Sequence, residues 1–433
     1  MNPLATELNE IIQENAPAVM KVLSRLGREL YFPRGILTQS AEAKQKATRY
    51  NATIGEARDS QHSMGLRSIM CHFSDLSPDQ VLPYAPSAGR ADLRTAWQEE
   101  VREKNPSLGD TPISLPVVTS GITHGLSTVA DMFVDEGDLV LLPDKLWGNY
   151  TLIFGVKRGA RLGTYPLLGP DGGFDMVGFR RTLRENAGAG KLIVLFNFPN
   201  NPTGYSISSA EADGIRDALV EVAEGGCGVV AVCDDAYFGL FYDEHVMKES
   251  LFTRLAAAHP GILAIKLDGA SKEDFAWGLR VAFITYGIAG GAEAYEALEK
   301  KTGGCIRGTV SNSPNVSQAL VMKAMADPEY RSQKAENFAI LERRAARVKE
   351  ALTEPRFAAV WTPYPFNSGY FLCLRLNDLD AEAYRVRLLN DHGVGVISTS
   401  STDIRVALSS VDETDIVDML DVMLTCALEM KAD

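Results

Sequence analysis

Residues 262–272 read Ile262-Leu263-Ala264-Ile265-Lys266-Leu267-Asp268-Gly269-Ala270-Ser271-Lys272, a strand-like apolar run that breaks at a glycine and ends in a lysine. Arg280 follows this lysine eight positions later. An amine at the end of a strand can condense with an aldehyde to form an imine, so Lys272 is a candidate covalent catalyst. Most lysines at strand ends are solvated surface residues, and that interpretation holds unless other segments complete a ligand site.

The run belongs to a series along the middle of the chain. Comparable runs, separated by longer amphipathic stretches, lie at residues 115–120, 138–143, 192–198, 228–234, 262–267 and 281–286. Strands that alternate with helices in this way predict an α/β fold, in which a mostly parallel sheet is sandwiched by helices. A ligand then lies at the carboxyl ends of the strands.

The pattern changes after residue 304. Helical periodicity covers residues 315–326 and 328–352, strand-like runs follow at 370–376, 394–400 and 404–408, and a last helix begins near 412. These elements predict a smaller α+β domain built from both chain ends. We expect residues 1–75 to contribute to this small domain and to dimer contacts, residues 76–305 to form the large ligand-binding domain, and residues 306–433 to complete the small domain.

The composition narrows the possible functions. The chain has 433 residues, more than one typical hydrophobic core accommodates, and 45% of them are hydrophobic. Its formal net charge of -13 argues against a nucleic-acid partner. The six cysteines include no CxxC pair and the six histidines no HExxH motif, which favours a reducing compartment and predicts no metal site. An acidic start and the lack of an 18-residue apolar stretch predict no signal peptide and no membrane span. We expect a cytoplasmic protein that acts on small molecules.

Polar residues gather where the predicted strands end. The first strand leads into Thr119-Ser120-Gly121-Ile122-Thr123-His124-Gly125, a glycine turn before a helix whose free N–H groups suit a phosphate, although an ordinary helix start fits equally. Trp147 follows the second strand and can cover a flat ring, or simply be part of the core. Two further strand ends read Asn200-Asn201-Pro202-Thr203-Gly204 and Asp234-Asp235-Ala236-Tyr237. A carboxylate buried there needs a cationic partner or a donor, and a protonated pyridine nitrogen would serve.

A reactive lysine, a phosphate turn, a stacking ring, an amide, a tyrosine and an aspartate together describe one ligand, pyridoxal phosphate. The motifs NNPTG (200–204), DDAY (234–237), SK (271–272) and GLRV (278–281) occur in that order. With them the chain resembles the fold type I aminotransferases of class I/II, aspartate aminotransferase-like, over nearly its whole length. The resemblance implies a seven-stranded-type sheet in the large domain.

The resemblance also implies roles for single residues. Lys272 would hold pyridoxal 5'-phosphate as an imine and then carry the proton between Cα of the substrate and the cofactor. Asp234 would keep the pyridine nitrogen protonated, Asn201 and Tyr237 would bind the phenolic oxygen, and Trp147 would stack on the ring.

The phosphate would be held by backbone and hydroxyl donors and by one guanidinium. The residues implied are Gly121, Ile122, Thr123 and Arg280. Relatives carry a serine where this chain has Gly269, so Ser271 would make a different contact, or a weaker one.

Substrate recognition depends on arginines, because a planar guanidinium grips a carboxylate with two parallel hydrogen bonds. Arg405 matches the residue that binds the α-carboxylate in relatives, and Asn367 and Gly55 resemble positions on the substrate side of the pocket. Tyr84 resembles a tyrosine that crosses to the partner subunit and touches the phosphate, which implies a homodimer with shared active sites.

Arg307 decides the expected substrate. It lies in Cys305-Ile306-Arg307-Gly308-Thr309-Val310-Ser311-Asn312, which aligns without a gap on the stretch where aspartate aminotransferases bind the distal carboxylate. We therefore expect transfer of an amino group between an L-amino acid, with aspartate and glutamate favoured, and a 2-oxo acid. If Arg307 is instead a surface or interface residue, the donor is aromatic, alanine or another amino acid.

The same scaffold also supports lyases, decarboxylases and synthases, since the fold does not decide which bond to Cα breaks. A cofactor-binding transcription regulator is disfavoured, because the acidic residues before Asn51 leave no room for a basic winged helix.

Overall fold

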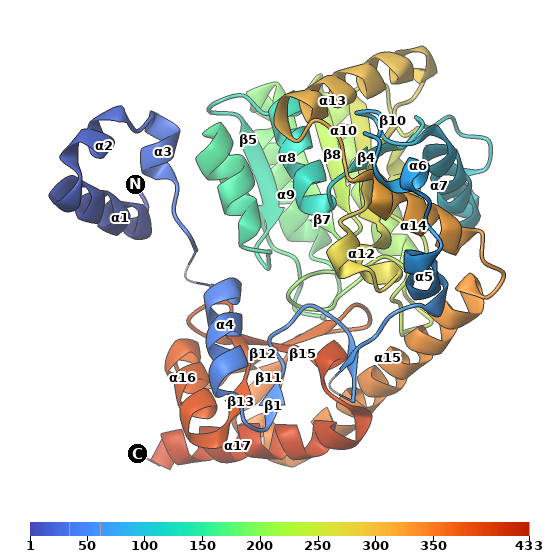
Figure 1. The fold of residues 1–433 in the computed structure, drawn as a ribbon. Helices are drawn as coiled ribbons and strands as arrows, with labels where there is room; N and C mark the ends of the chain where they lie inside the picture. Colours follow the sequence, from blue (N-terminus) through green and yellow to red (C-terminus); the bar gives the residue numbers. More distant parts are fainter. Residues whose placement is uncertain (34, 61, 433) are drawn as a thin grey trace.

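A sheet of seven strands forms the centre of the large domain in the computed structural model, which describes residues 1–33, 35–60 and 62–432 (Figure 1). Its strands are, in spatial order, β4 (Val117–Thr119), β10 (Ala282–Gly287), β9 (Ile262–Gly269), β8 (Gly228–Asp234), β7 (Lys191–Asn197), β5 (Leu139–Pro143) and β6 (Arg161–Tyr165). The strands from β9 to β6 are parallel, and β10 is antiparallel to both of its neighbours. This confirms the predicted α/β fold.

Helices cover both faces of this sheet, because successive side chains of a strand point to opposite faces. On β5, Leu139 and Leu141 pack into one core and Val140 and Leu142 into the other. The first core is closed mainly by α7 (Ala91–Lys104), α9 (Met176–Asn186), α10 (Ser209–Glu224) and α11 (Phe252–Leu255), and the second by α8 (Ile122–Phe133) and α13 (Tyr295–Thr309). Each fully buried Leu or Val side chain contributes about 1.5–3 kcal/mol. Every residue of β5 is buried, as expected for a parallel strand covered on both sides.

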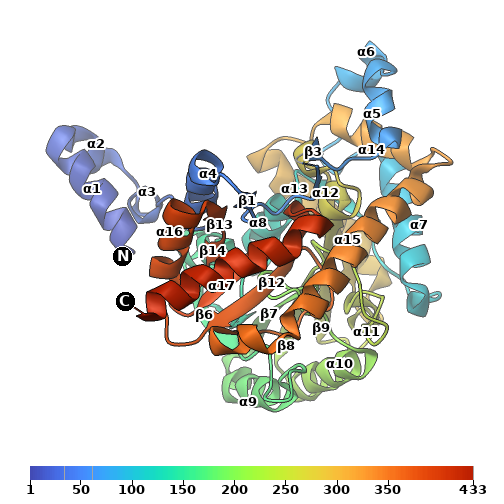
Figure 2. The ribbon, with the colours of Figure 1, turned by 90° about the horizontal axis from the view of Figure 1, so that it is seen from below.

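The small domain is a second layered unit built from both ends of the chain. An antiparallel sheet orders its strands as β11 (Trp361–Pro363), β12 (Phe371–Leu376), β15 (Asp403–Ala407) and β14 (Ile397–Ser398). It packs against α16 (Ala381–His392) and α17 (Ile416–Ala432) (Figure 2). The N-terminal segment joins this domain through β1 (Tyr50–Asn51), which pairs in parallel with β13 (Val394–Gly395), and through α4 (Ile36–Lys46).

The two domains meet along one long helix, α15 (Tyr330–Leu352). Its first half and the preceding α14 (Asn315–Met325) contribute Val321, Ala324 and Tyr330 to the large-domain core. Its second half contributes Ala345 and Val348 to the small-domain core. The predicted division at residue 306 stays a prediction, and this packing favours a division within α15.

The first three helices stand apart from both domains (Figures 1 and 2). They are α1 (Pro3–Asn15), α2 (Pro17–Val22) and α3 (Arg25–Glu29). Val22 and Phe32 are exposed there, and Arg25 forms an ion pair with Glu136 of the large domain. Other short elements include β2 (Arg58–Asp59), β3 (His62–Ser63), α5 (Arg67–Met70), α6 (Pro78–Val81) and α12 (Ala270–Glu273). Across the described ranges, each helix is too short or too polar to span a membrane.

Candidate active site

A cavity of about 270 Å³ lies at the carboxyl ends of the large-domain strands, against the small domain. It is lined by Ile36, Gly55, Ile122, Thr123, Trp147, Tyr150, Asn197, Asn201, Asp234, Ala236, Tyr237, Ser271, Lys272, Arg280, Phe371 and Arg405. The structure thus brings together most of the residues that the sequence singled out. Ile36, Tyr150, Asn197 and Phe371 line the cavity without having been predicted.

Lys272 reaches the cavity because the chain turns sharply after β9. A Cβ atom at Gly269 would lie 2.6 Å from both the Ala282 Cα and the Val281 carbonyl oxygen of the neighbouring strand, so there is no room for the serine of relatives. The Lys272 Nζ donates to the Gly55 carbonyl, 2.6 Å away. Burial lowers the pKa of Lys272 to about 7. The positive charges of Arg405 and Arg280 also lower it, whereas the carboxylates of Glu56 and Asp234 oppose the shift.

Asp234 is the last residue of β8 and is buried. The Tyr150 hydroxyl donates to its Oδ2 at 2.5 Å, and the Ala236 N–H donates to its Oδ1 at 3.2 Å. Burial raises the pKa of Asp234 to about 6, while these two donors oppose the rise. The carboxylate is therefore mostly ionised at neutral pH. Tyr150 is one helical turn after Trp147, and the two rings meet edge to face at 5.5 Å.

Arg405 comes from the small domain, on β15, and is buried against the Phe371 ring, 4.0 Å from its centre. Its Nη1 donates to the Asn201 Oδ1 at 3.1 Å, and its Nη2 donates to the Thr53 carbonyl at 2.9 Å. Among the described residues, its Nε has no hydrogen-bond partner. Burial lowers the pKa of Arg405 to about 10, so it is still a cation at neutral pH. A buried guanidinium with a donor to spare suits a carboxylate ligand.

The opposite end of the cavity is suited to a phosphate. Gly121 has a φ of +83°, and a Cβ atom there would collide with the Arg280 guanidinium, so only glycine lets this turn approach the arginine. Ile122 and Thr123 begin the 12-residue helix α8 beside it. The buried Ser271 Oγ faces the same cavity, without a hydrogen-bond partner in the part of the chain that the structure describes.

Comparison with known proteins identifies the family. The family model "Aminotransferase class I and II" matches residues 51–422. The chain belongs to this family. A probable N-succinyldiaminopimelate aminotransferase of Mycobacterium tuberculosis is 28% identical over 48% of this chain, which spans about half (49%) of that relative's length. An aspartate/prephenate aminotransferase of Cereibacter sphaeroides is 25% identical over 76% of this chain and 80% of its own.

Solved structures agree on the fold. An aminotransferase from Anaerococcus prevotii has a TM-score of 0.82 at 22% identity and covers 92% of this chain and 97% of its own. The Pyrococcus horikoshii kynurenine aminotransferase, solved with pyridoxamine phosphate (PMP), has a TM-score of 0.78 at 18% identity and covers 95% and 98%.

Aminotransferases of class I and II use pyridoxal phosphate, and the cavity residues fit that group. The orphan Ser271 Oγ and the Arg280 guanidinium offer donors for a phosphate at one end. The buried Asp234 carboxylate suits a protonated ring nitrogen, and the Lys272 amine suits the aldehyde. Trp147 lies in the wall, positioned to cover a flat ring.

Asn367, a predicted site residue, is not among the residues that line the cavity. The Asn367 side chain binds the backbone of Ser206, accepting from its N–H at 2.8 Å and donating to its carbonyl at 2.9 Å. These two bonds occupy the Asn367 amide, and the expectation that Asn367 lies on the substrate side of the pocket stays a prediction. Its amide instead fastens the segment between β11 and β12 to Ser206, just after the NNPTG turn, because a buried backbone N–H and C=O need partners.

Two other predicted site residues lie together on the outside. Tyr84 is 91% exposed in the loop after α6, and Arg307 is exposed on α13. Hydrogen bonds join their surroundings, from the Asn312 amide to the Ala85 carbonyl at 3.1 Å and from the Ser87 hydroxyl to the Ser311 carbonyl at 2.9 Å. The Arg307 Nη1 donates to the Ser311 hydroxyl at 2.6 Å. We call this surface the Tyr84–Arg307 ledge.

Proposed function

We propose that the chain is a pyridoxal-phosphate-dependent aminotransferase that moves an amino group between a dicarboxylic L-amino acid, aspartate or glutamate, and a 2-oxo acid. The observation that carries the proposal is the Lys272 amine. It is half-buried, with a pKa of about 7, in the same cavity as the Asp234 carboxylate and the Arg405 guanidinium. A solvated structural lysine has no reason to occupy such a place.

Lys272 has two tasks in this proposal. Its neutral amine would hold the cofactor through the aldehyde carbon, and the free amine would serve as the base that accepts the proton of the substrate Cα and later releases it. When bound, pyridoxal phosphate supplies an electron-poor ring that stabilises negative charge at Cα. A pKa of about 7 suits both tasks, since the amine can accept and release a proton at neutral pH.

The other cavity residues orient the reactants. Asp234 would hold the ring nitrogen, and the Tyr150 hydroxyl, which donates to its Oδ2, helps to keep that carboxylate ionised. Arg405 occupies the Asn201 Oδ1, so the Asn201 amide would act as a donor to the phenolic oxygen, together with the Tyr237 hydroxyl. Trp147 covers the ring and excludes water. Thr123, Ser271 and Arg280, with the backbone at Gly121 and Ile122, hold the phosphate.

Arg405 binds the α-carboxylate of the substrate, with Gly55 beside it. The cations that line the cavity within the described residues are Lys272, Arg280 and Arg405, and each already has a task. A distal carboxylate therefore needs a cation from another chain. We assign this role to the partner subunit's Arg307, carried with the partner's Tyr84 on the Tyr84–Arg307 ledge of a two-fold dimer. The six free cysteines support the cytoplasm as the compartment.

A second donor class is favoured by one observation. Ile36 and Phe371 contribute apolar walls to the cavity, which would suit an aromatic or aliphatic side chain. The names of relatives span this range, from aspartate and prephenate to kynurenine.

A donor panel separates these possibilities. We expect Arg307→Ala to lower kcat/KM for aspartate and glutamate by about 10- to 100-fold, the value of one lost charge-assisted hydrogen bond, and to leave alanine and phenylalanine nearly unchanged. Arg347→Ala, at a half-buried arginine of α15 that pairs with Glu350, is the control for loss of a guanidinium elsewhere. Equal losses for all donors would refute the distal-carboxylate role. Release of ammonia or carbon dioxide in place of a 2-oxo acid would refute transamination.

Mixed dimers test where Arg307 acts. Lys272→Ala and Arg307→Ala subunits are mixed and allowed to exchange. If each subunit lends Arg307 to its partner, one site of every hybrid dimer is native, and about a quarter of wild-type aspartate activity returns. No recovery in a sample with proven exchange would show that Arg307 acts elsewhere.

A further inference from the structure

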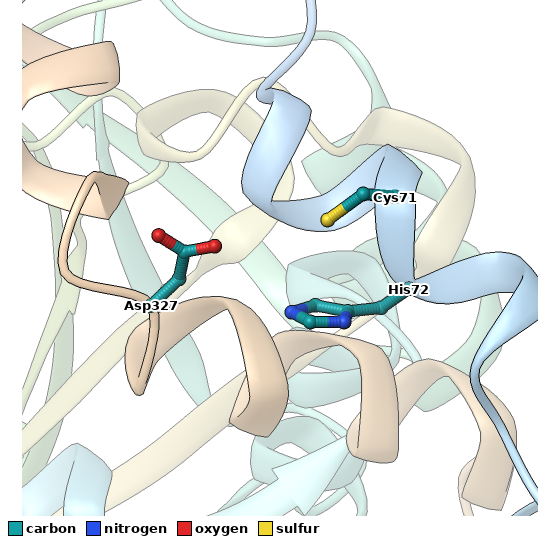
Figure 3. Close-up of side chains that lie close together, drawn as sticks. All are labelled: Cys71, His72 and Asp327. Carbon is teal, nitrogen blue, oxygen red and sulfur yellow. The ribbon is translucent and has the colours of Figure 1, made fainter.

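Three side chains of different ligand types converge outside the active site (Figure 3). Cys71 and His72 begin a single 3₁₀ turn (Cys71–Ser74) after α5, and Asp327 lies in the turn that joins α14 to α15. The Cys71 sulfur, a ring nitrogen of His72 and a carboxylate oxygen of Asp327 all lie within 4.8 Å of one another. Thiolate, imidazole and carboxylate are the three protein ligands that zinc uses.

Two of these side chains are already oriented by a second contact. The Asp75 Oδ2 lies 3.4 Å from the His72 Nδ1, which leaves the Nε2 as the ring atom for an ion. One Asp327 oxygen accepts from the Glu329 N–H at 2.8 Å, which holds the carboxylate in place while its second oxygen keeps its lone pairs. Carboxylate support of a ligating histidine is the arrangement found around zinc.

The surrounding charges allow a cation. Asp75 and Asp327 contribute two negative charges, and a bound thiolate would add a third. The Lys323 amine is near, donating to the Asp75 carbonyl at 3.4 Å, and Arg67 is paired with Glu329 at 3.3 Å. Of the six cysteines, Cys71 is the exposed one, so its side chain can rotate toward an ion. Tetrahedral zinc holds its ligand atoms roughly 3.3–3.8 Å apart, so only a small closure is needed.

We propose that Cys71, His72 and Asp327 form a zinc site with one position left for water, distinct from the active site. The set contains a soft sulfur and a nitrogen, which favours Zn²⁺ over Mg²⁺ or Ca²⁺. Because Cys71 and Asp327 are far apart in the chain, bound zinc would fasten the segment before α6 to the α14–α15 turn. The absence of a HExxH motif predicted no metal site, and this cluster escapes that search because its third ligand is remote in sequence.

Zinc binding to the cofactor-loaded, tag-free protein tests the proposal. After chelator treatment and desalting, calorimetric titration with ZnCl₂ should show one Zn²⁺ per chain, and the ion should slow the reaction of Cys71 with a thiol reagent. Cys71→Ser and Asp327→Asn should each remove this binding, and Asp75→Asn should weaken it by about tenfold or more. Cys305→Ser and Asp79→Asn, a half-buried cysteine and an exposed aspartate outside the cluster, are the matched controls.

The readouts do not depend on catalysis, so they also hold if the proposed reaction is wrong. Binding that is absent from the wild type, or that persists equally in Cys71→Ser and Asp327→Asn, overturns the site.

Discussion

Two lysines six residues apart, at the middle and the end of the same strand-to-helix segment, have opposite environments. Lys266 is buried in β9 between the Asp235 and Asp268 carboxylates, 2.6 and 2.9 Å from its Nζ. Lys272 is half-buried after Gly269, and its Nζ donates to a backbone carbonyl, with no ion pair to a carboxylate among the described residues. The two carboxylates raise the pKa of Lys266 against the effect of burial, whereas burial lowers the pKa of Lys272 to about 7.

Burial alone does not make a lysine reactive. The pair of carboxylates holds Lys266 as a permanent cation, supported by the Trp97 indole N–H on Asp268 at 3.1 Å and the Ser250 hydroxyl on Asp235 at 2.6 Å. Lys272 has no such compensation, so its neutral form is accessible at physiological pH. Lys266 therefore has a structural role, and Lys272 is the lysine suited to catalysis.

The largest expected effect is the difference in activity between substitutions at Lys272 and at Lys266. Lys272→Ala should lower kcat by at least about 10⁴-fold and abolish the visible absorbance of lysine-bound cofactor, because both the attachment point and the proton carrier are lost. Steady-state rates and absorbance spectra measure this. Lys266→Ala, if it folds, should keep the absorbance band. A Lys272→Ala protein that retains the band would contradict the assignment.

The free energy of unfolding should depend more on Lys266 than on Lys272. Lys266→Met leaves two carboxylates buried without their cation and should cost about 3–5 kcal/mol of unfolding free energy. Lys272→Met removes an amine that has no carboxylate partner and should change stability little. Denaturant unfolding of both cofactor-free variants measures the difference. Equal destabilisation would mean that the two amines are in similar states.

The smallest effect concerns pH. Only a neutral amine attacks an aldehyde, and Lys272 is neutral above its pKa of about 7. The rate at which cofactor-free protein takes up pyridoxal phosphate should therefore rise about tenfold from pH 6 to pH 8 and then level off. Stopped-flow absorbance measures the profile. A rate that is still rising at pH 10 would show that the amine keeps an ordinary lysine pKa.

Several parts of this molecule were predictable because their signals are local. The strand-like runs 192–198 and 228–234 correspond to β7 and β8, since continuous apolar stretches of that length suit a sheet covered on both faces. The run 394–400 was less accurate, because it forms two short strands, Val394–Gly395 and Ile397–Ser398, in different sheets. Chain pattern alone does not reveal where a strand changes partner.

Some cavity residues are likewise predictable from local motifs, and others are not. Lys272, Asp234 and Asn201 belong to short motifs whose spacing follows from a turn at the end of a strand. Tyr150 donates to Asp234 from 84 positions away, and such a contact leaves no mark in either segment. Asn367 lies in a segment that resembles a substrate-binding stretch, yet its side-chain amide is hydrogen-bonded to the Ser206 backbone.

The residues alone therefore indicate an α/β fold, the cofactor and the lysine that holds it, because strand periodicity and turn motifs depend on neighbours in the chain. The tertiary structure decides which lysine is reactive and which is inert. Lys266 and Lys272 are the same residue type on one segment, and the distance from each amine to carboxylates on other strands determines which of them loses its proton. That distance exists only after the sheet has formed.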